Sequence, residues 1–119
     1  MRLALRWLAH ARSGDKGDRA NVGVIALRPA WYPAIAAALT ADRVAAHLAP
    51  MARGPVDRYE LANLHALNFV VHGALDGGGT MSLRTDAQGK VFSTALLRLE
   101  VDVPDEIGHE ALAAAGRSA

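Results

Sequence analysis

The chain contains no cysteine, and this absence excludes several kinds of protein at once. Without thiols there is no disulfide framework, no thiolate nucleophile and no zinc site built on cysteine. A long hydrophobic run is also missing, since no apolar stretch approaches the roughly 20 residues of a membrane-spanning helix. The first ten residues carry charge within their apolar stretch and lack a small-residue cleavage site, so no secretory signal is predicted. We therefore expect a cytoplasmic protein that does not associate with membranes.

Net charge and aromatic residues are scarce as well. The formal charge is +1, and the sequence has neither the basic face of a nucleic-acid-binding protein nor the clustered charges of a polybasic membrane anchor. Aromatic residues make up 5% of the chain, so the core must consist mainly of Leu, Val, Ile and Ala. A chain of 119 residues fits one domain and buries only about two-thirds of its unfolded surface. We therefore expect it to form homo-oligomers.

Apolar periodicity predicts an alternation of strands and helices. Strands are expected at 3–11, 21–28, 56–61 and 80–85, a loop at 13–20, a break at 50–55, a turn at 86–89, and helices at 31–39, 41–48 and 91–99. Thr40 is expected to cap the second helix. Residues 63–75 favour a helix, although Leu67, Phe69 and Val71 also alternate as a strand would.

The order of these elements predicts the fold class. It suggests a two-layer α+β sandwich, with a sheet of about four antiparallel or mixed strands and helices packed on one face. The folded domain is expected to span residues 1–104. Residues 105–119 then form an Ala-rich tail that is either a loose helix or disordered.

Polar chemistry is concentrated between His10 and Asn21. Gly14 and Gly17 allow backbone N–H groups to turn toward one point, and Arg12 and Lys16 supply positive charge. Lys16 stands out because the chain has eleven arginines and only two lysines, and a compact ammonium group differs in chemistry from a guanidinium. The combination suits an anionic or carboxylate-bearing ligand. The alternative is a strand connection whose charges pair among themselves.

Other interpretations of this segment are weaker. It is neither a phosphate-binding Walker loop nor a dinucleotide fingerprint. Ser13 as a nucleophile would need His10 as its base, and residues three apart on a strand point to opposite faces. We therefore predict no cofactor.

A second polar group consists of Asn63, His65, Asn68 and His72. On a helix, the last three would share one face, where the histidines could be metal ligands or proton carriers. A separation of seven residues is not a close-ligand spacing, and no carboxylate lies between the two histidines. Two histidines satisfied at a helix surface are favoured, and no metal site is predicted.

Three blocks of sequence resemble one family. They are residues 11–18 (ARSGDKGD) followed by 21–26 (NVGVIA), residues 58–75 (RYELANLHALNFVVHGAL) and residues 82–90 (SLRTDAQGK). In this order they resemble the C-terminal domain of acyclic terpene utilisation (AtuA-like) proteins over about residues 3–103. The chain departs from the expected pattern at Asp18 and Ala62, where Asn and Pro are expected. The carboxylate of Asp18 lowers the positive potential beside Lys16.

The resemblance implies a ferredoxin-like α+β fold and a link to acyclic terpenoid breakdown through CoA-thioester steps. Longer members carry a large N-terminal domain ahead of this one, so the chain resembles a free-standing version. No catalytic role carries over; only the positions of the family's main motif do. The positions that match this motif are Ser13, Gly14, Asp15, Lys16, Gly17 and Asn21. Together with Arg12 they are the candidate ligand-binding residues, and the residue types alone add His10, Asn63, His65, Asn68 and His72 as secondary candidates.

Two functions follow as hypotheses. The first is an accessory or interaction domain that acts with a separately encoded large AtuA-like domain. The second is a domain that binds a small anion, a carboxylate or a CoA thioester, and is catalytic or not, through the segment from Arg12 to Asn21. Whether the chain is an enzyme stays open at this point.

Overall fold

The computed structural model describes residues 1–16, 19–49, 52, 54–73 and 92–117. The regular elements are β1 (Arg2–Ala4), β2 (Ala9–Lys16), β3 (Arg19–Ala26), α1 (Tyr32–Ala38), α2 (Ala41–Leu48), β4 (Val56–Leu61), β5 (Ala66–Val71), a short helix at 92–97, β6 (Glu100–Asp102) and α4 (Asp105–Ala114). Single turns of 3-10 helix, η1 (Leu5–Trp7), η2 (Pro29–Trp31) and η3 (Ala62–Leu64), connect them. No helix in these ranges is long and apolar enough to cross a membrane.

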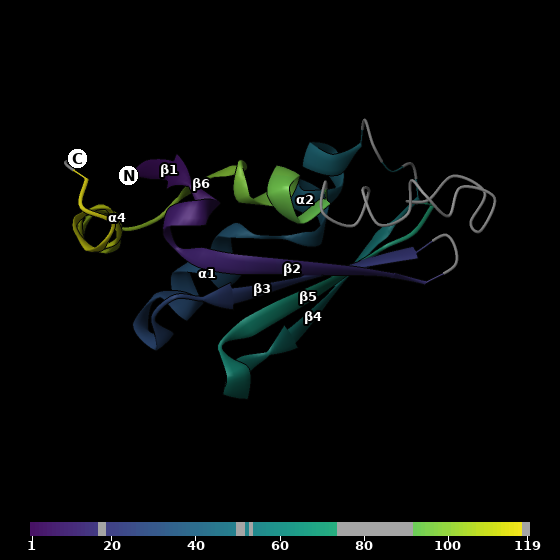
Figure 1. Cartoon of the computed structure of the whole chain (residues 1–119), viewed down its shortest axis with the longest axis horizontal. Coiled ribbons are helices and arrows are strands. Elements are labelled where there is room, and N and C mark those ends of the chain that lie inside the picture. The colour runs from purple at the N-terminus through teal and green to yellow at the C-terminus, as the bar shows by residue number, and fades with distance from the viewer. Residues whose placement is uncertain (17–18, 50–51, 53, 74–91, 118–119) are drawn as a thin grey trace.

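Four strands form one antiparallel sheet in the order β2-β3-β5-β4. Strands β1 and β6 pair separately and join the two ends of the chain. Figure 1 shows β1, β6 and α4 together at one end of the molecule, while β2 and β3 run toward the other end. The fold is therefore α+β, with a four-stranded antiparallel sheet and helices, as the element order predicts.

The core lies between one face of the sheet and the helices. Alternate residues of β3 and β5 are buried on this inner face: Ala20, Val22, Val24, Leu67, Phe69 and Val71. They belong to one apolar cluster with helix residues such as Ile35, Val44, Leu48 and Leu96. Burial of these mainly aliphatic side chains supplies most of the driving force for folding.

Several local predictions are confirmed. The Thr40 side chain accepts a hydrogen bond from the Arg43 backbone N–H at 3.1 Å and caps α2. Helix α1 lies within the range predicted for 31–39, and Pro33 is in its first turn, where its missing N–H costs nothing. Strand β4 has the predicted bounds, 56–61, and residues 92–97 are helical within the range predicted for 91–99.

The prediction of one strand over residues 3–11 is wrong, because η1 separates β1 from β2. Leu5 and Leu8 are both fully buried, although they are three residues apart. A 3-10 turn places positions i and i+3 on the same side, whereas a strand would point them to opposite faces. The alternating pattern was thus compatible with a strand, but burial of Leu8 favours the turn.

The predicted loop at 13–20 is also wrong over the residues that the structure describes. Residues 13–16 continue β2, and residues 19–20 begin β3, with Lys16 opposite Arg19. Turn-type residues extend this hairpin because every residue from 9 to 16 has a partner across the ladder. Gly17 lies outside the described residues.

Residues 63–73 do not form the favoured helix; the strand alternative is correct. Residues 66–71 form β5, with Leu67, Phe69 and Val71 buried and paired to β3 and β4 on either side. A central strand gains more burial than an isolated helical stripe would. The strand predicted at 80–85 and the turn at 86–89 lie outside the described residues.

Arg58 connects the sheet to the helical layer. Its Nε donates to the carbonyl oxygen of Leu39 at 2.9 Å, and its Nη2 donates to that of Ala36 at 2.8 Å. Both carbonyls are at the carboxyl end of α1, where helix carbonyls lack partners within the helix. Arg58 thereby fixes the end of α1 to β4.

The Ala-rich C-terminal segment packs on the N-terminal one as α4. Ala111 is buried in the core cluster, and a β-carbon at Gly108 would collide with the Met1 side chain. The N-terminal ammonium group donates to the carbonyl oxygen of Val103 at 2.7 Å and to Asp105 Oδ1 at 2.9 Å. The two chain ends therefore hold one another in place.

Candidate functional site

The predicted ligand-binding residues are on the hairpin formed by β2 and β3. Residues directly opposite one another in an antiparallel pair point to the same face. Arg12 lies opposite Gly23, and Gly14 lies opposite Asn21, and these residues are on the sheet face that points away from the helices. We call this the outer face; it comprises residues 10, 12 and 14 of β2, 21, 23 and 25 of β3, 66, 68 and 70 of β5, and 57, 59 and 61 of β4.

Ser13 does not share the outer face. It lies opposite the buried Val22 and so points toward the core side, and it is engaged there in an interaction. His10, opposite Ile25, points outward. The expectation that His10 and Ser13 are on opposite faces is confirmed, and a nucleophile–base pair between them is excluded by the register. The backbones of Asp15 and Lys16 belong to β2.

The register brings the two predicted polar groups together. One row across the outer face reads Arg12, Gly23, Asn68 and Tyr59. Arg12 and Asn68 are two strands apart, roughly 10 Å between backbones, and Gly23 between them has no side chain. Arg12 is exposed and Asn68 is half-buried. We call this row the polar row, because a cation lies on one side of Gly23 and an amide on the other.

The remaining secondary candidates are scattered. Asn63 is exposed in η3. His65 follows it with a left-handed backbone, φ 53°, and its ring contacts Tyr32 edge-on at 6.1 Å. His72 lies just after β5, where its Nε2 is 2.8 Å from Asp57 Oδ2. Among the described residues, no three His, Asp or Glu side chains gather closely enough to hold a metal ion.

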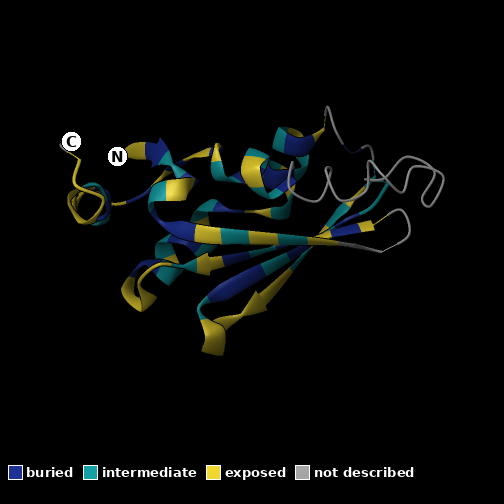
Figure 2. Ribbon diagram, in the orientation of Figure 1, coloured by how far each residue is buried: buried dark blue, intermediate teal, exposed yellow. Residues whose placement is uncertain are grey.

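The sequence analysis did not identify the apolar residues that lie next to the polar row. Ile25, Ala66 and Leu61 form a neighbouring row on the outer face. Ile25 is 39% exposed, Leu61 39% and Tyr59 52%, and Figure 2 shows the turn between β4 and β5 as exposed. Gly23 could have drawn attention to this face, since a glycine inside a strand often marks a site that a ligand or another backbone approaches closely. The apolar residues could be placed only once the register was known.

The outer face thus combines an apolar row with the polar row. Exposed apolar side chains lie beside Arg12 and Asn68 on one face of the sheet. This face presents the guanidinium of Arg12, the amides of Asn21 and Asn68, and the apolar row. At one edge of this face, the Asp57 carboxylate lies 2.8 Å from His72 Nε2.

Comparison with known proteins agrees with this architecture. No curated protein and no solved structure matches the chain. The family model that describes the AtuA ferredoxin-like domain matches residues 3–102, which includes both strands of the hairpin, β4, β5 and the residues of the outer face. Since this match covers most of the chain, the protein belongs to the family of AtuA ferredoxin-like domains.

Proposed function

We propose that the chain is an accessory interaction domain whose outer face docks on a separately encoded large AtuA-like domain. Such a complex would serve the acyclic terpenoid breakdown with which the family is linked. The observation that carries the proposal is the outer face itself. Three large apolar side chains, Ile25, Tyr59 and Leu61, are 39% to 52% exposed there.

The position of this face relative to the core supports the proposal. The described helices pack on the inner face, so residues of the outer face can be covered only by another molecule or by other parts of the chain. An interface needs an apolar centre with polar groups at its edge, and Arg and Tyr are enriched at such centres. Arg12 and Tyr59 occupy the two ends of one row. The matching surface of the partner is expected to be apolar with a carboxylate near Arg12.

The experiment is a pull-down of the tagged domain from native cytosol, with Ile25→Glu as the test variant. Ala37→Glu is the control, because Ala37 is exposed on α1, in the layer on the other side of the sheet. We expect one large protein to co-purify in stoichiometric amount with the wild type and the control, and to be lost with Ile25→Glu. If the wild-type domain purifies alone, the proposal is overturned.

A second copy of the chain is the competing occupant of the outer face. The wild type would then form an oligomer by itself, which light scattering after size-exclusion chromatography measures. Dissociation of that oligomer by Ile25→Glu, with no companion protein in the pull-down, would identify self-association as the use of this face.

The polar row and the neighbouring Asn21 favour a second candidate function, the binding of a small carboxylate or phosphate. Arg12 supplies charge, and the amide groups of Asn21 and Asn68 can donate hydrogen bonds. Calorimetric titration with acetate, phosphate and CoA tests it. Binding that is lost in Arg12→Gln and kept in Arg98→Gln would support this function; no heat with any of the three anions would contradict it.

A further inference from the structure

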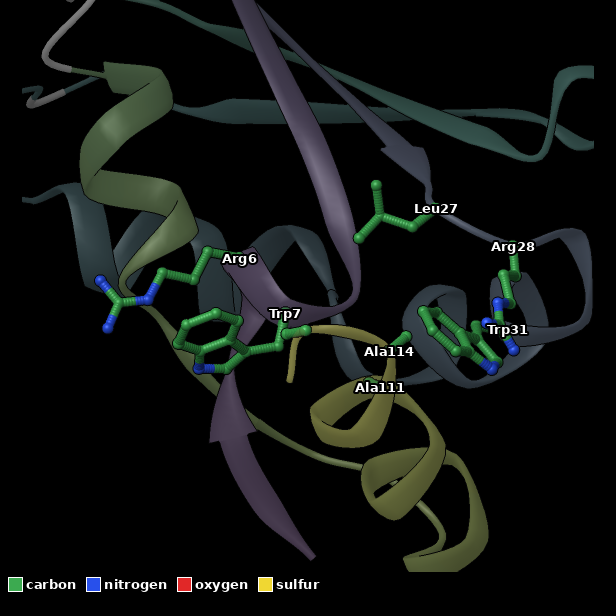
Figure 3. Close-up of a pocket in the computed structure, with 8 residues that line it drawn as sticks. Arg6, Trp7, Leu27, Arg28, Trp31, Ala111 and Ala114 are labelled. Carbon is green, nitrogen blue, oxygen red and sulfur yellow. The ribbon is translucent and has the colours of Figure 1, made fainter. Parts of the chain in front are cut away.

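A pocket of about 300 Å³ lies away from the outer face, where the two ends of the chain meet. Its walls come from η1, from the segment after β3, from η2 and from α4 (Figure 3). This volume is at the lower end for pockets that bind small molecules. Helix α4 (Asp105–Ala114) lies beyond the segment that the family model matches, so one wall comes from outside that segment.

Two indole rings form opposite sides of the pocket. Figure 3 shows Trp7 and Trp31 across from one another, with Leu27 above the space between them. Trp31 is 1% exposed, and its Nε1–H donates to Glu110 Oε1 at 2.8 Å, which fixes the ring. Trp7 is half-buried. An apolar body placed between the rings would contact both of them.

The third wall leaves the space open because its side chains are small. Ala111, Ala114 and Ala115 line it from α4 and the residue after it. Ala111 is buried, whereas Ala114 and Ala115 are exposed. Any larger side chain at position 114 would occupy part of the pocket, and Figure 3 shows Ala114 beside Trp31.

Positive charge surrounds this apolar space. The guanidinium carbons of Arg6 and Arg117 are 4.8 and 4.7 Å from the centre of the Trp7 ring, and that of Arg28 is 5.1 Å from the centre of the Trp31 ring. The carboxylate of Glu110 is 3.9 Å from Arg28 and also accepts from Trp31. Within the described ranges, neither Arg6 nor Arg117 has an ion-pair partner. Arg6 lines the pocket, whereas Arg117 contacts Trp7 without lining it, so Arg6 is the cation best placed to attract an anion bound there.

We propose that this pocket binds a small organic monocarboxylate, with its apolar body between Trp7 and Trp31 and its carboxylate near Arg6. A planar guanidinium donates two parallel hydrogen bonds to a carboxylate, which makes arginine suited to this group. The mainly apolar lining requires a ligand with a hydrocarbon or aromatic body. This proposal is independent of the role of the outer face.

The chain carries its own probe for this binding. Its two tryptophans both line the pocket, so intrinsic fluorescence reports on it directly. The probe ligand is octanoate, which does not absorb at the excitation wavelength, and octan-1-ol is its uncharged counterpart. We expect a saturable change in fluorescence with octanoate, and binding of octan-1-ol that is weaker by about tenfold, since the alcohol lacks charge-assisted hydrogen bonds.

Three variants and one control define the site. Arg6→Gln is expected to weaken octanoate binding by about tenfold and to leave octan-1-ol binding unchanged. Arg117→Gln, at a residue that does not line the pocket, is expected to weaken octanoate binding less. Ala114→Leu should prevent binding of both, while leucine preserves the helix at this exposed position. Arg19→Gln is the charge-matched control; it lies at the opposite end of β3, roughly 25 Å away along the strand.

Each contrary result overturns a defined part of the proposal. No saturable change with octanoate excludes the site. Equal binding of octanoate and octan-1-ol, unaffected by the arginine variants, excludes recognition of a carboxylate. Binding that survives Ala114→Leu, with circular dichroism showing a folded protein, places the ligand elsewhere. Ile25→Glu should not change octanoate binding, so failure of the docking proposal and failure of this one are distinguishable.

Discussion

Replacing Arg58 with methionine tests how strongly the sheet is fixed to the helical layer. Arg58 donates to two carbonyl oxygens at the end of α1, those of Leu39 at 2.9 Å and Ala36 at 2.8 Å. Methionine keeps an apolar stem of similar length against the same surface but removes both donors. The variant therefore isolates the hydrogen bonds from the packing.

The expected loss follows from the geometry. A hydrogen bond with a charged donor contributes about 1.5–3 kcal/mol. The Arg58 side chain is 23% exposed, so water reaches the freed carbonyls and the lower value applies. The ion pair with Glu60, at 3.6 Å, adds little because the Glu60 side chain is 59% exposed. We expect the free energy of unfolding to fall by about 3 kcal/mol, and Tm to fall by about 12 °C for a chain of this length.

Urea denaturation followed by tryptophan fluorescence is the assay, because Trp31 is 1% exposed in the folded state. Arg58→Lys should give an intermediate loss of about 1.5 kcal/mol, since one ammonium group does not reproduce the two fixed donors. Arg98→Met is the control, as that side chain is exposed. If Arg58→Met and Arg98→Met unfold at the same urea concentration, the two bonds do not stabilise the fold and the reasoning fails.

Three further substitutions test other contacts. Gly54→Ala should destabilise the fold by more than about 2 kcal/mol, because its β-carbon would lie 2.3 Å from the His72 carbonyl oxygen, whereas Gly14→Ala, with open space around it, should leave the unfolding midpoint unchanged. Leu48→Ala should cost about 2–5 kcal/mol in thermal or urea unfolding, since this side chain is fully buried. The N-terminal ammonium group holds the pKa of Asp105 below its ordinary value of 3.8, through a hydrogen bond and Coulomb attraction. Stability from this contact is therefore present above the ordinary carboxyl pKa and is lost as the pH falls through the folded-state pKa; an NMR titration in which Asp105 keeps its ordinary pKa would contradict this.

The sequence predicted elements well where the local signal and the tertiary environment agree. Thr40 followed by an apolar helical stripe is such a case, because both the cap and the buried face lie within nine residues. Residues 13–16 and 66–71 are the opposite case. Residues 13–16 have turn-type composition, and residues 66–71 pair in part with β3, which is distant in sequence. In both segments, strand pairing and burial outweighed the local preference for a loop or a helix.

The candidate site shows a related limit. Arg12 and Asn68 were both selected from the sequence, but as members of two unrelated groups on a loop and a helix. The pocket residues Trp7 and Trp31 were not selected, although tryptophan is rare in this chain and carries a polar N–H that needs a partner when buried. Their relation depends on α4 packing between the segments that contain them, which no local pattern indicates.

The outer face is a product of strand register. Shifting β2 by one residue against β3 would turn Arg12 toward the core and Ser13 outward, because side chains alternate with a period of two. The buried residues Val22 and Phe69, opposite one another on the inner face, therefore determine what the outer face presents. Conservative changes at these core positions that preserve stability should also preserve the binding proposed for the outer face. A register shift would remove the polar row without altering any of its residues. The binding proposed for the outer face thus depends on the core as directly as on Arg12 and Asn68.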